Sequence, residues 1–238
     1  MKYIQYIKHL VTQNKSQIVV VLMTFTYILS FIYLRQSRMH MSVYELLQRF
    51  TTPIISALII IPCFLIMIDH GILFYNDTNV IIRFQSRFKW GLNQLVCLLF
   101  DCSIYAAFIM LLLVSGVICI LGVYCFNVDF ILHLISLFLI IIIGLYSVGI
   151  VYILLSLLSE NYIAFAIIVF LGIFEDRVDI PIIARKIFPN YYQDFQINIL
   201  VYLSNGFLHL VAYFMSIIII SALLYFLSIN NREYSLEK

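Results

Sequence analysis

The stretch DHGILFYNDTNVIIRFQSRFKW, residues 69–90, is a polar segment between two long apolar runs. With helical spacing, Phe84 and Phe88 fall on one side, and Arg83 and Arg87 lie together on a neighbouring strip. The pattern predicts a basic amphipathic helix. Beside runs long enough to cross a bilayer, such a helix is expected to lie along the cytoplasmic surface, with its aromatic rings at headgroup depth and its cations toward anionic lipid or a protein. A lipid anchor with no further role is the alternative.

Hydrophobic residues make up 64% of the 238-residue chain, and charged residues make up 11%. A soluble domain is about 45–50% apolar, so this composition predicts an integral membrane protein. The net charge is +2, and the cations form short clusters near the ends of apolar runs, which is typical of membrane topology and not of nucleic-acid binding. The five cysteines form no CxxC pair and have no histidine at metal-ligand spacing, so we expect neither a disulfide nor a metal site.

The apolar runs predict an all-α membrane protein of one domain with six transmembrane helices. The predicted spans are residues 18–34, 51–68, 95–123, 131–158, 162–174 and 207–229. Residues 2–17 predict an interfacial helix before the first span. The fifth run has 13 residues, fewer than the roughly 20 that cross a bilayer. We expect it to continue into the following polar segment or to turn back within the membrane, and residues 175–206 predict short outer or re-entrant helices.

Two features predict local geometry. Pro62 lies inside the second run, where a proline removes a backbone hydrogen bond and kinks the helix. Ser159, Glu160 and Asn161 are the polar break between the fourth and fifth runs, and so short a break predicts a tight helical hairpin. Six spans put both termini on one side. The cations of the central stretch, and the absence of Lys and Arg from residues 124–130, favour cytoplasmic termini.

The sequence offers few groups for catalysis. No serine lies in a Gly-x-Ser-Gly-like setting, and His133 and His209 lie on apolar faces, where packing is the commoner role. Residues 175–177, Glu-Asp-Arg, resemble part of an acidic motif of CAAX-type membrane proteases, but the histidines that would complete a metal site do not follow. No GxxxxGK[ST] motif occurs. We expect no catalytic residue, metal or nucleotide site, and keep a membrane-embedded hydrolase as an alternative.

Asp101 is the acidic residue closest to the interior of an apolar run. An ionised carboxylate at the centre of a bilayer costs about 2.5–3.5 kcal/mol on insertion scales, which would mark a role in a pathway or in coupling. Residues 102–123 are long enough to cross the bilayer without it, so Asp101 can also lie at the inner interface. We favour the interfacial location and keep the buried one open.

The segment GIVYILLSLLSENYIAFAI, residues 149–167, resembles the small-residue span, the Leu-Ser-x-Leu turn and the following x-Asn-x-x-Ala helix of the permease subunits of ABC-2-type transporters. Residues 69–95 are similar to the longer inner loop of that family, which contains the coupling helix and a Ser-Arg-like element, here Ser86 and Arg87. Asp69 takes the place of the acidic residue that opens this loop. The segment IFPNYYQDF, residues 187–195, resembles the proline-containing outer segment before the last span.

The resemblance is to the small six-span bacterial permeases that export peptides or confer peptide resistance, such as bacitracin, lantibiotic or phenol-soluble-modulin systems. It implies a multi-pass protein of the bacterial plasma membrane with no nucleotide site of its own. A separate ABC ATPase, in two copies, would bind ATP and Mg, and a second six-span permease would complete a homodimer or heterodimer. An immunity or structural membrane protein without transport is a further alternative.

The resemblance also implies where contacts lie. The predicted ATPase-docking residues come from the central stretch and from the turn after the fourth span: Arg83, Phe84, Arg87, Phe88, Lys89, Trp90, Ser159, Glu160 and Asn161. Asp69 and Asp101 are the candidates for a pathway or coupling role.

The spans contain few ionisable groups, whereas the chain has 20 Phe and 17 Tyr. This composition favours an amphipathic peptide or lipid-like cargo over a small charged solute.

Overall fold

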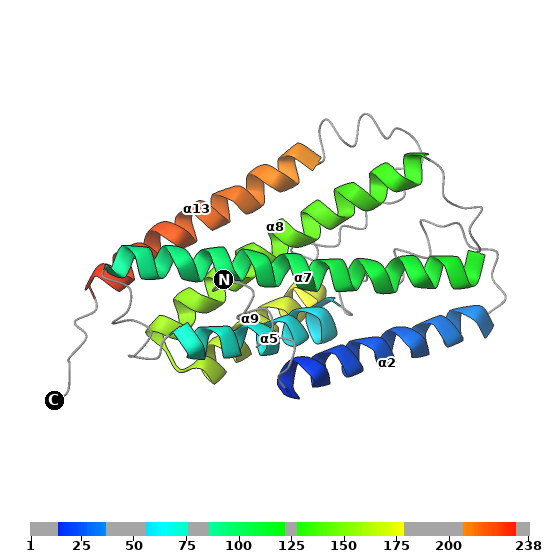
Figure 1. The fold of residues 1–238 in the computed structure, drawn as a ribbon, viewed down its shortest axis with the longest axis horizontal. Helices are drawn as coiled ribbons and strands as arrows, with labels where there is room; N and C mark the ends of the chain where they lie inside the picture. Colours follow the sequence, from blue (N-terminus) through cyan, green and yellow to red (C-terminus); the bar gives the residue numbers. More distant parts are fainter. Residues whose placement is uncertain (1–13, 37–55, 76–85, 122–127, 179–206, 232–238) are drawn as a thin grey trace, which may run out of the picture.

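The computed structural model describes residues 14–36, 56–75, 86–121, 128–178 and 207–231. Within these ranges every residue except Ser86, Ser159 and Glu160 lies in a helix. Figure 1 shows the elements, which in chain order are α2 (Asn14–Gln36), the π-helical turn η1 (Ser56–Ile60), α5 (Ile61–Tyr75), α7 (Arg87–Leu121), α8 (Val128–Leu158), α9 (Asn161–Val178) and α13 (Phe207–Asn231).

Three described helices are long and apolar enough to cross a bilayer: Arg87–Ile120, Phe130–Leu158 and Val211–Ile229. Three further apolar stretches, Ile18–Leu29, Leu58–Asp69 and Asn161–Phe174, are shorter. The described part of the chain is therefore all-helical with membrane-spanning character, as the composition predicts. That the chain crosses the membrane six times stays a prediction. The segments predicted as an interfacial helix, residues 2–17, and as short outer helices, residues 175–206, lie largely outside the described residues.

The tight hairpin predicted between the fourth and fifth runs is confirmed. Helix α8 ends at Leu158 and α9 begins at Asn161, so two residues connect them. Helix α9 continues to Val178, four residues beyond the apolar run, as expected for a run too short to span alone. The helical hairpin thus has its turn fixed by the polar residues that the sequence places there.

Helix α7 starts before the predicted third span, residues 95–123. Helix α7 begins at Arg87, inside the basic stretch, and runs without a break to Leu121. Ser86 is its N-terminal cap, because Ser86 Oγ accepts a hydrogen bond from the Lys89 N–H at 3.2 Å and Ser86 C=O accepts one from the Trp90 N–H at 3.1 Å. The end of the basic stretch is therefore the first turn of a long helix.

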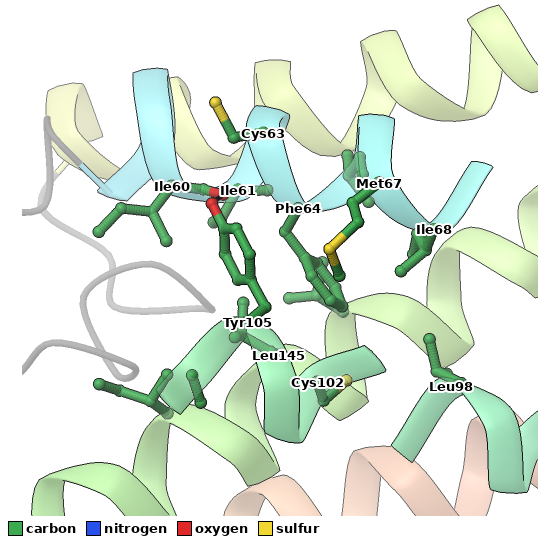
Figure 2. Packing of buried hydrophobic residues seen from close by; sticks show 14 of the residues in the cluster. Ile60, Ile61, Cys63, Phe64, Met67, Ile68, Leu98, Cys102, Tyr105 and Leu145 are labelled. Carbon is green, nitrogen blue, oxygen red and sulfur yellow. Dashed lines mark hydrogen bonds between the residues drawn. The ribbon is translucent and has the colours of Figure 1, made fainter. Parts of the chain in front are cut away.

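The π-helical turn η1 directly precedes α5, in which Pro62 is the second residue. Proline is tolerated in the first turn of a helix, where its missing N–H has no intrahelical partner, and the kink expected at Pro62 stays a prediction. Ile60 C=O, at the end of η1, accepts a hydrogen bond from Tyr105 Oη of α7 at 2.8 Å. Figure 2 shows the Tyr105 ring reaching from α7 to Ile60. A side chain from another helix thereby satisfies a carbonyl beside the irregular turn.

One buried hydrophobic cluster joins all of these elements. Glycines allow close approach at two contacts: a Cβ at Gly149 of α8 would lie 2.7 Å from Leu98 of α7, and one at Gly91 of α7 would lie 3.0 Å from Ile229 of α13. Successive helices along the chain run in opposite directions (Figure 1). As a result, the end of α5, the start of α7, the α8–α9 turn and the end of α13 lie toward one end of the bundle, at the left of Figure 1.

Gly116 tests the packing of α2 on α7. A Cβ at this position would overlap the ring of Phe31 on α2, so we expect Gly116→Ala to displace the ring and to destabilise the protein by about 1–3 kcal/mol. Thermal unfolding in detergent micelles measures the effect. The matched control is Ser115→Ala, because Ser115 is exposed and its hydroxyl donates to Leu112 C=O of its own helix. Equal losses from the two variants would contradict the packing argument.

Candidate functional site

Asp69, in the second half of α5, accepts two hydrogen bonds at the same carboxylate oxygen. Tyr152 Oη of α8 and Asn161 Nδ2 of α9 each donate to Asp69 Oδ1 at 2.8 Å. Asp69 is half-buried and Tyr152 is buried. Hydrogen bonds to an ionised carboxylate are about twice as strong as bonds between neutral groups. We call these three residues the Asp69 cluster, and it ties α5, α8 and α9 together beside the α8–α9 turn.

The backbone of the turn is satisfied within the hairpin. The Ser159 N–H and Ser159 Oγ both donate to Leu155 C=O, at 2.8 and 2.9 Å. Glu160 C=O accepts from the N–H groups of Ile163 and Ala164, at 2.9 and 3.1 Å. These bonds end α8 and begin α9 within two residues, so the turn has a defined conformation.

The predicted docking residues of the turn have different environments. Asn161 binds Asp69, and the Ser159 hydroxyl binds its own helix, so both side chains are engaged inside the hairpin. Glu160 is exposed. Its neighbours Leu158 and Tyr162 are 72% and 67% exposed. The outward surface of the turn, Leu158, Glu160 and Tyr162, therefore contains only one of the three residues that the sequence suggested.

The described part of the predicted docking set from the central stretch lies at the start of α7. Arg87, Phe88 and Lys89 are exposed, and no acidic residue occupies the first turn, so this helix end is strongly positive. The ring of Phe88 is 61% exposed and stacks on Phe226 of α13 with the centroids 4.9 Å apart. This surface combines charge with an aromatic ring. Arg83 and Phe84 lie outside the described residues.

Trp90 lies apart from the exposed residues of the predicted docking set. Its side chain is 0% exposed and belongs to the buried hydrophobic cluster. Successive helical residues are rotated by about 100°, so Trp90 lies on nearly the opposite side of α7 from the exposed Phe88. The sequence suggested one aromatic surface, but the helix divides these rings between surface and core.

Asp101 lies apart from the other candidates. It is 14 residues beyond Arg87 along α7, which corresponds to about 21 Å at 1.5 Å per residue. Its side chain is 3% exposed. Helix α7 extends on both sides of Asp101. The side chain is therefore enclosed by the protein, and its interfacial depth in the bilayer stays a prediction.

Sequence reasoning missed Tyr152 and a second buried polar pair, Gln94 and Tyr225. The Tyr225 hydroxyl donates to Gln94 Oε1 across the contact between α13 and α7, and both side chains are buried. Gln94 Nε2 has no hydrogen-bond acceptor among the described residues. Neither tyrosine has a sequence signal, since both are among many aromatic residues in apolar runs. From the sequence, only the need of the Asp69 carboxylate for hydrogen-bond donors pointed to a side chain such as Tyr152.

No group of three or more His, Cys, Asp or Glu side chains that could hold a metal is present in the described ranges. The Asp69 cluster can fix the relative positions of α5, α8 and α9 near the α8–α9 turn.

Comparison with protein-family models, characterised proteins and solved structures gives no match. The functional interpretation therefore depends on the sequence pattern and on the arrangement of these side chains.

The Gln94–Tyr225 pair can be measured by a double-mutant cycle. Gln94→Leu removes the acceptor of the Tyr225 hydroxyl, and Tyr225→Phe removes the donor to the Gln94 carbonyl. Each single change should lower the free energy of unfolding by about 1–3 kcal/mol. The double variant replaces both groups with apolar ones, and we expect its loss to be smaller than the sum by about 0.5–3 kcal/mol. Thermal unfolding in detergent gives the values. As control, Ser216→Ala combined with Tyr225→Phe should be additive, because the Ser216 hydroxyl is exposed and donates to its own helix. Strict additivity for Gln94 and Tyr225 would contradict the pairing.

Proposed function

We propose that this chain is the permease subunit of an ABC-2-type exporter, with six transmembrane helices and both termini in the cytoplasm of a bacterial cell. One observation carries the proposal. The two segments that the resemblance assigns to inner loops lie toward the same end of the bundle, although they are far apart in sequence. The hydrogen bond from Asn161 to Asp69 joins one to the other directly.

Helix lengths and directions support the six-span arrangement. Helices α2 and α9 have 23 and 18 residues, which corresponds to about 35 and 27 Å. Elements η1 and α5 together cover residues 56–75, about 30 Å. With their polar ends included, these helices are about as long as the roughly 30 Å hydrocarbon layer, whereas the apolar stretches within them, Ile18–Leu29, Leu58–Asp69 and Asn161–Phe174, are shorter. The alternating directions in Figure 1 are those of a chain that crosses a membrane repeatedly.

The partner in this proposal is a separate ABC ATPase, present in two copies, which binds ATP and Mg. Its contacts are the positive start of α7, with Arg87, Phe88 and Lys89, and the turn carrying Glu160. A second six-span permease, identical or different, completes the pathway. Closure of the ATPase dimer would push these surfaces and rearrange the helices.

The proposed cargo is an amphipathic peptide or a lipid-like molecule. The buried polar and charged side chains of the described residues, tyrosines aside, all belong to the three long helices: Gln94, Asp101, His133, Ser136, Ser147, Ser156 and Ser221. Ser136, Ser147 and Ser156 donate to carbonyls of their own helix, so their oxygens keep capacity to accept. This set provides few charges and scattered polar groups, which suits an apolar cargo with some hydrogen-bonding capacity.

Replacing Arg87 and Phe88 together by Ala tests the docking surface. The change removes a cation and an exposed ring from the start of α7, and we expect at least about a tenfold loss of the ATPase that co-purifies from native membranes, since aromatic and Arg side chains dominate protein contacts. The chain itself should still insert. Leu92→Ala is the control, because Leu92 is 47% exposed one turn further into the apolar part of α7. Unchanged ATPase yield from the double variant, or an equal loss from the control, would contradict this surface.

Cysteine labelling tests the topology. In a background with Cys119 and Cys125 replaced by Ser, Glu160→Cys should react with a membrane-impermeant maleimide in inverted vesicles and stay unlabelled in right-side-out vesicles. Val128 is 73% exposed at the other end of α8, so Val128→Cys should show the reverse labelling pattern. Cys63, Cys97 and Cys102 are buried and can stay in place. Labelling of Glu160→Cys from outside would overturn the proposed orientation and with it the permease assignment.

A further inference from the structure

We propose that Asp69 clamps α5 to the α8–α9 turn, and that this unit pivots at the π-helical turn beside Pro62. A displacement of the turn is then delivered to the buried contact between η1 and Tyr105 of α7. The inference rests on the proposed function in one respect, namely that a partner protein supplies the push at the turn.

The clamp is defined by two hydrogen bonds between distant parts of the chain. Asp69 is separated in sequence from Tyr152 by 83 residues and from Asn161 by 92. Tyr152 is on the last two turns of α8, and Asn161 is the first residue of α9. Because one carboxylate oxygen accepts both bonds, neither helix of the hairpin can move relative to α5 without breaking a charge-assisted bond.

The clamped unit has an outward surface on which a partner can act. Leu158 and Tyr162 are largely exposed on either side of the exposed Glu160. The turn between them is held by the backbone bonds of Ser159 and Glu160. An anionic membrane surface repels a carboxylate, so this combination of an acid between two apolar side chains fits a protein surface with a cation better than lipid headgroups.

The other end of the unit is irregular. Element η1 has π-helical geometry, and Pro62 interrupts the regular hydrogen-bond ladder next to it. Between Pro62 and Asp69 the chain is regular α-helix, about 10 Å in length. Helix α9 also packs along both α5 and η1. A short helix thus connects the clamped end to the π-helical turn.

The pivot meets the core at Tyr105. Its hydroxyl donates to Ile60 C=O at 2.8 Å and contacts Met23 Sδ of α2 at 3.6 Å, and its ring packs against Phe64 of α5 with the centroids 5.4 Å apart. Figure 2 shows this side chain between the two helices. Tyr105 is buried, so movement of η1 changes a contact shared by α2, α5 and α7. The Asp69 clamp and the pivot at η1 therefore connect the exposed α8–α9 turn to the centre of the bundle.

Hydrogen exchange of the purified chain in nanodiscs tests the clamp without any partner. In the Asp69→Ala variant, amide exchange should rise about tenfold or more both in the second half of α5 and in residues 159–164, since the two segments lose the same bonds. Tyr152→Phe should raise exchange in both segments by less, and Asp69→Asn, which keeps an acceptor oxygen, should be intermediate. Ser156→Ala is the matched control, because its buried hydroxyl bonds its own helix one turn from Tyr152. Faster exchange in α5 alone, or equal effects from the control, would overturn the clamp.

The complex with its ATPase tests the transmission. Measured per captured ATPase and relative to the basal rate of the same variant, stimulation by a synthetic amphipathic Leu/Lys helical peptide should fall about tenfold for Asp69→Ala and less for Asp69→Asn. Normal stimulation in Asp69→Ala would overturn the transmission while leaving the permease assignment intact. If the wild-type chain captures no ATPase, the proposed function fails together with the transmission, and the exchange experiment still decides the clamp.

Discussion

A carboxylate within an apolar helical bundle is stable where hydrogen-bond donors reach it, because removing an unpaired charge from water is costly. Asp69 meets this requirement with donors from two other helices, and the requirement fixes the geometry of one end of the molecule. The α8–α9 turn cannot shift along α5 while both bonds persist. The same constraint explains why Asn161 begins α9 with its side chain directed to Asp69, leaving Glu160 to form the outward point of the turn.

Apolar surface alone gives little direction to helix association in a membrane, since lipid tails are as apolar as leucine side chains. Small residues and a few polar groups select the contacts here. Gly149 admits Leu98, Gly91 admits the side chains of α13, and Gln94 receives the Tyr225 hydroxyl one turn beyond Gly91. Tyr105 plays the same part beside η1, where it satisfies a carbonyl next to the irregular turn. These contacts hold the helices in the register that places the loop segments at one end.

The proposed docking surface follows from the continuity of α7. Since the basic stretch ends in the first turn of a long helix, Arg87 and Lys89 project from the same element that carries the buried Asp101. Phe88 stacks on Phe226, which connects the proposed docking surface to α13. In the proposed complex with an ATPase, the positive start of α7 and the clamped hairpin are two separate points of attachment on different helices.

Composition and apolar run length determined much of this architecture from the sequence alone. They gave an all-helical membrane protein and the hairpin at residues 159–161, because hydropathy and short polar breaks act locally. The resemblance to ABC-2-type permeases marked Asp69 and Asn161 as separate candidates. Only the tertiary structure brought these two residues together with Tyr152 and paired Gln94 with Tyr225. It also buried Trp90 on the side of α7 away from the exposed Phe88, and it enclosed Asp101. The rotation and axial register of packed helices decide such contacts, and in a chain with aromatic residues on every face no local pattern specifies them.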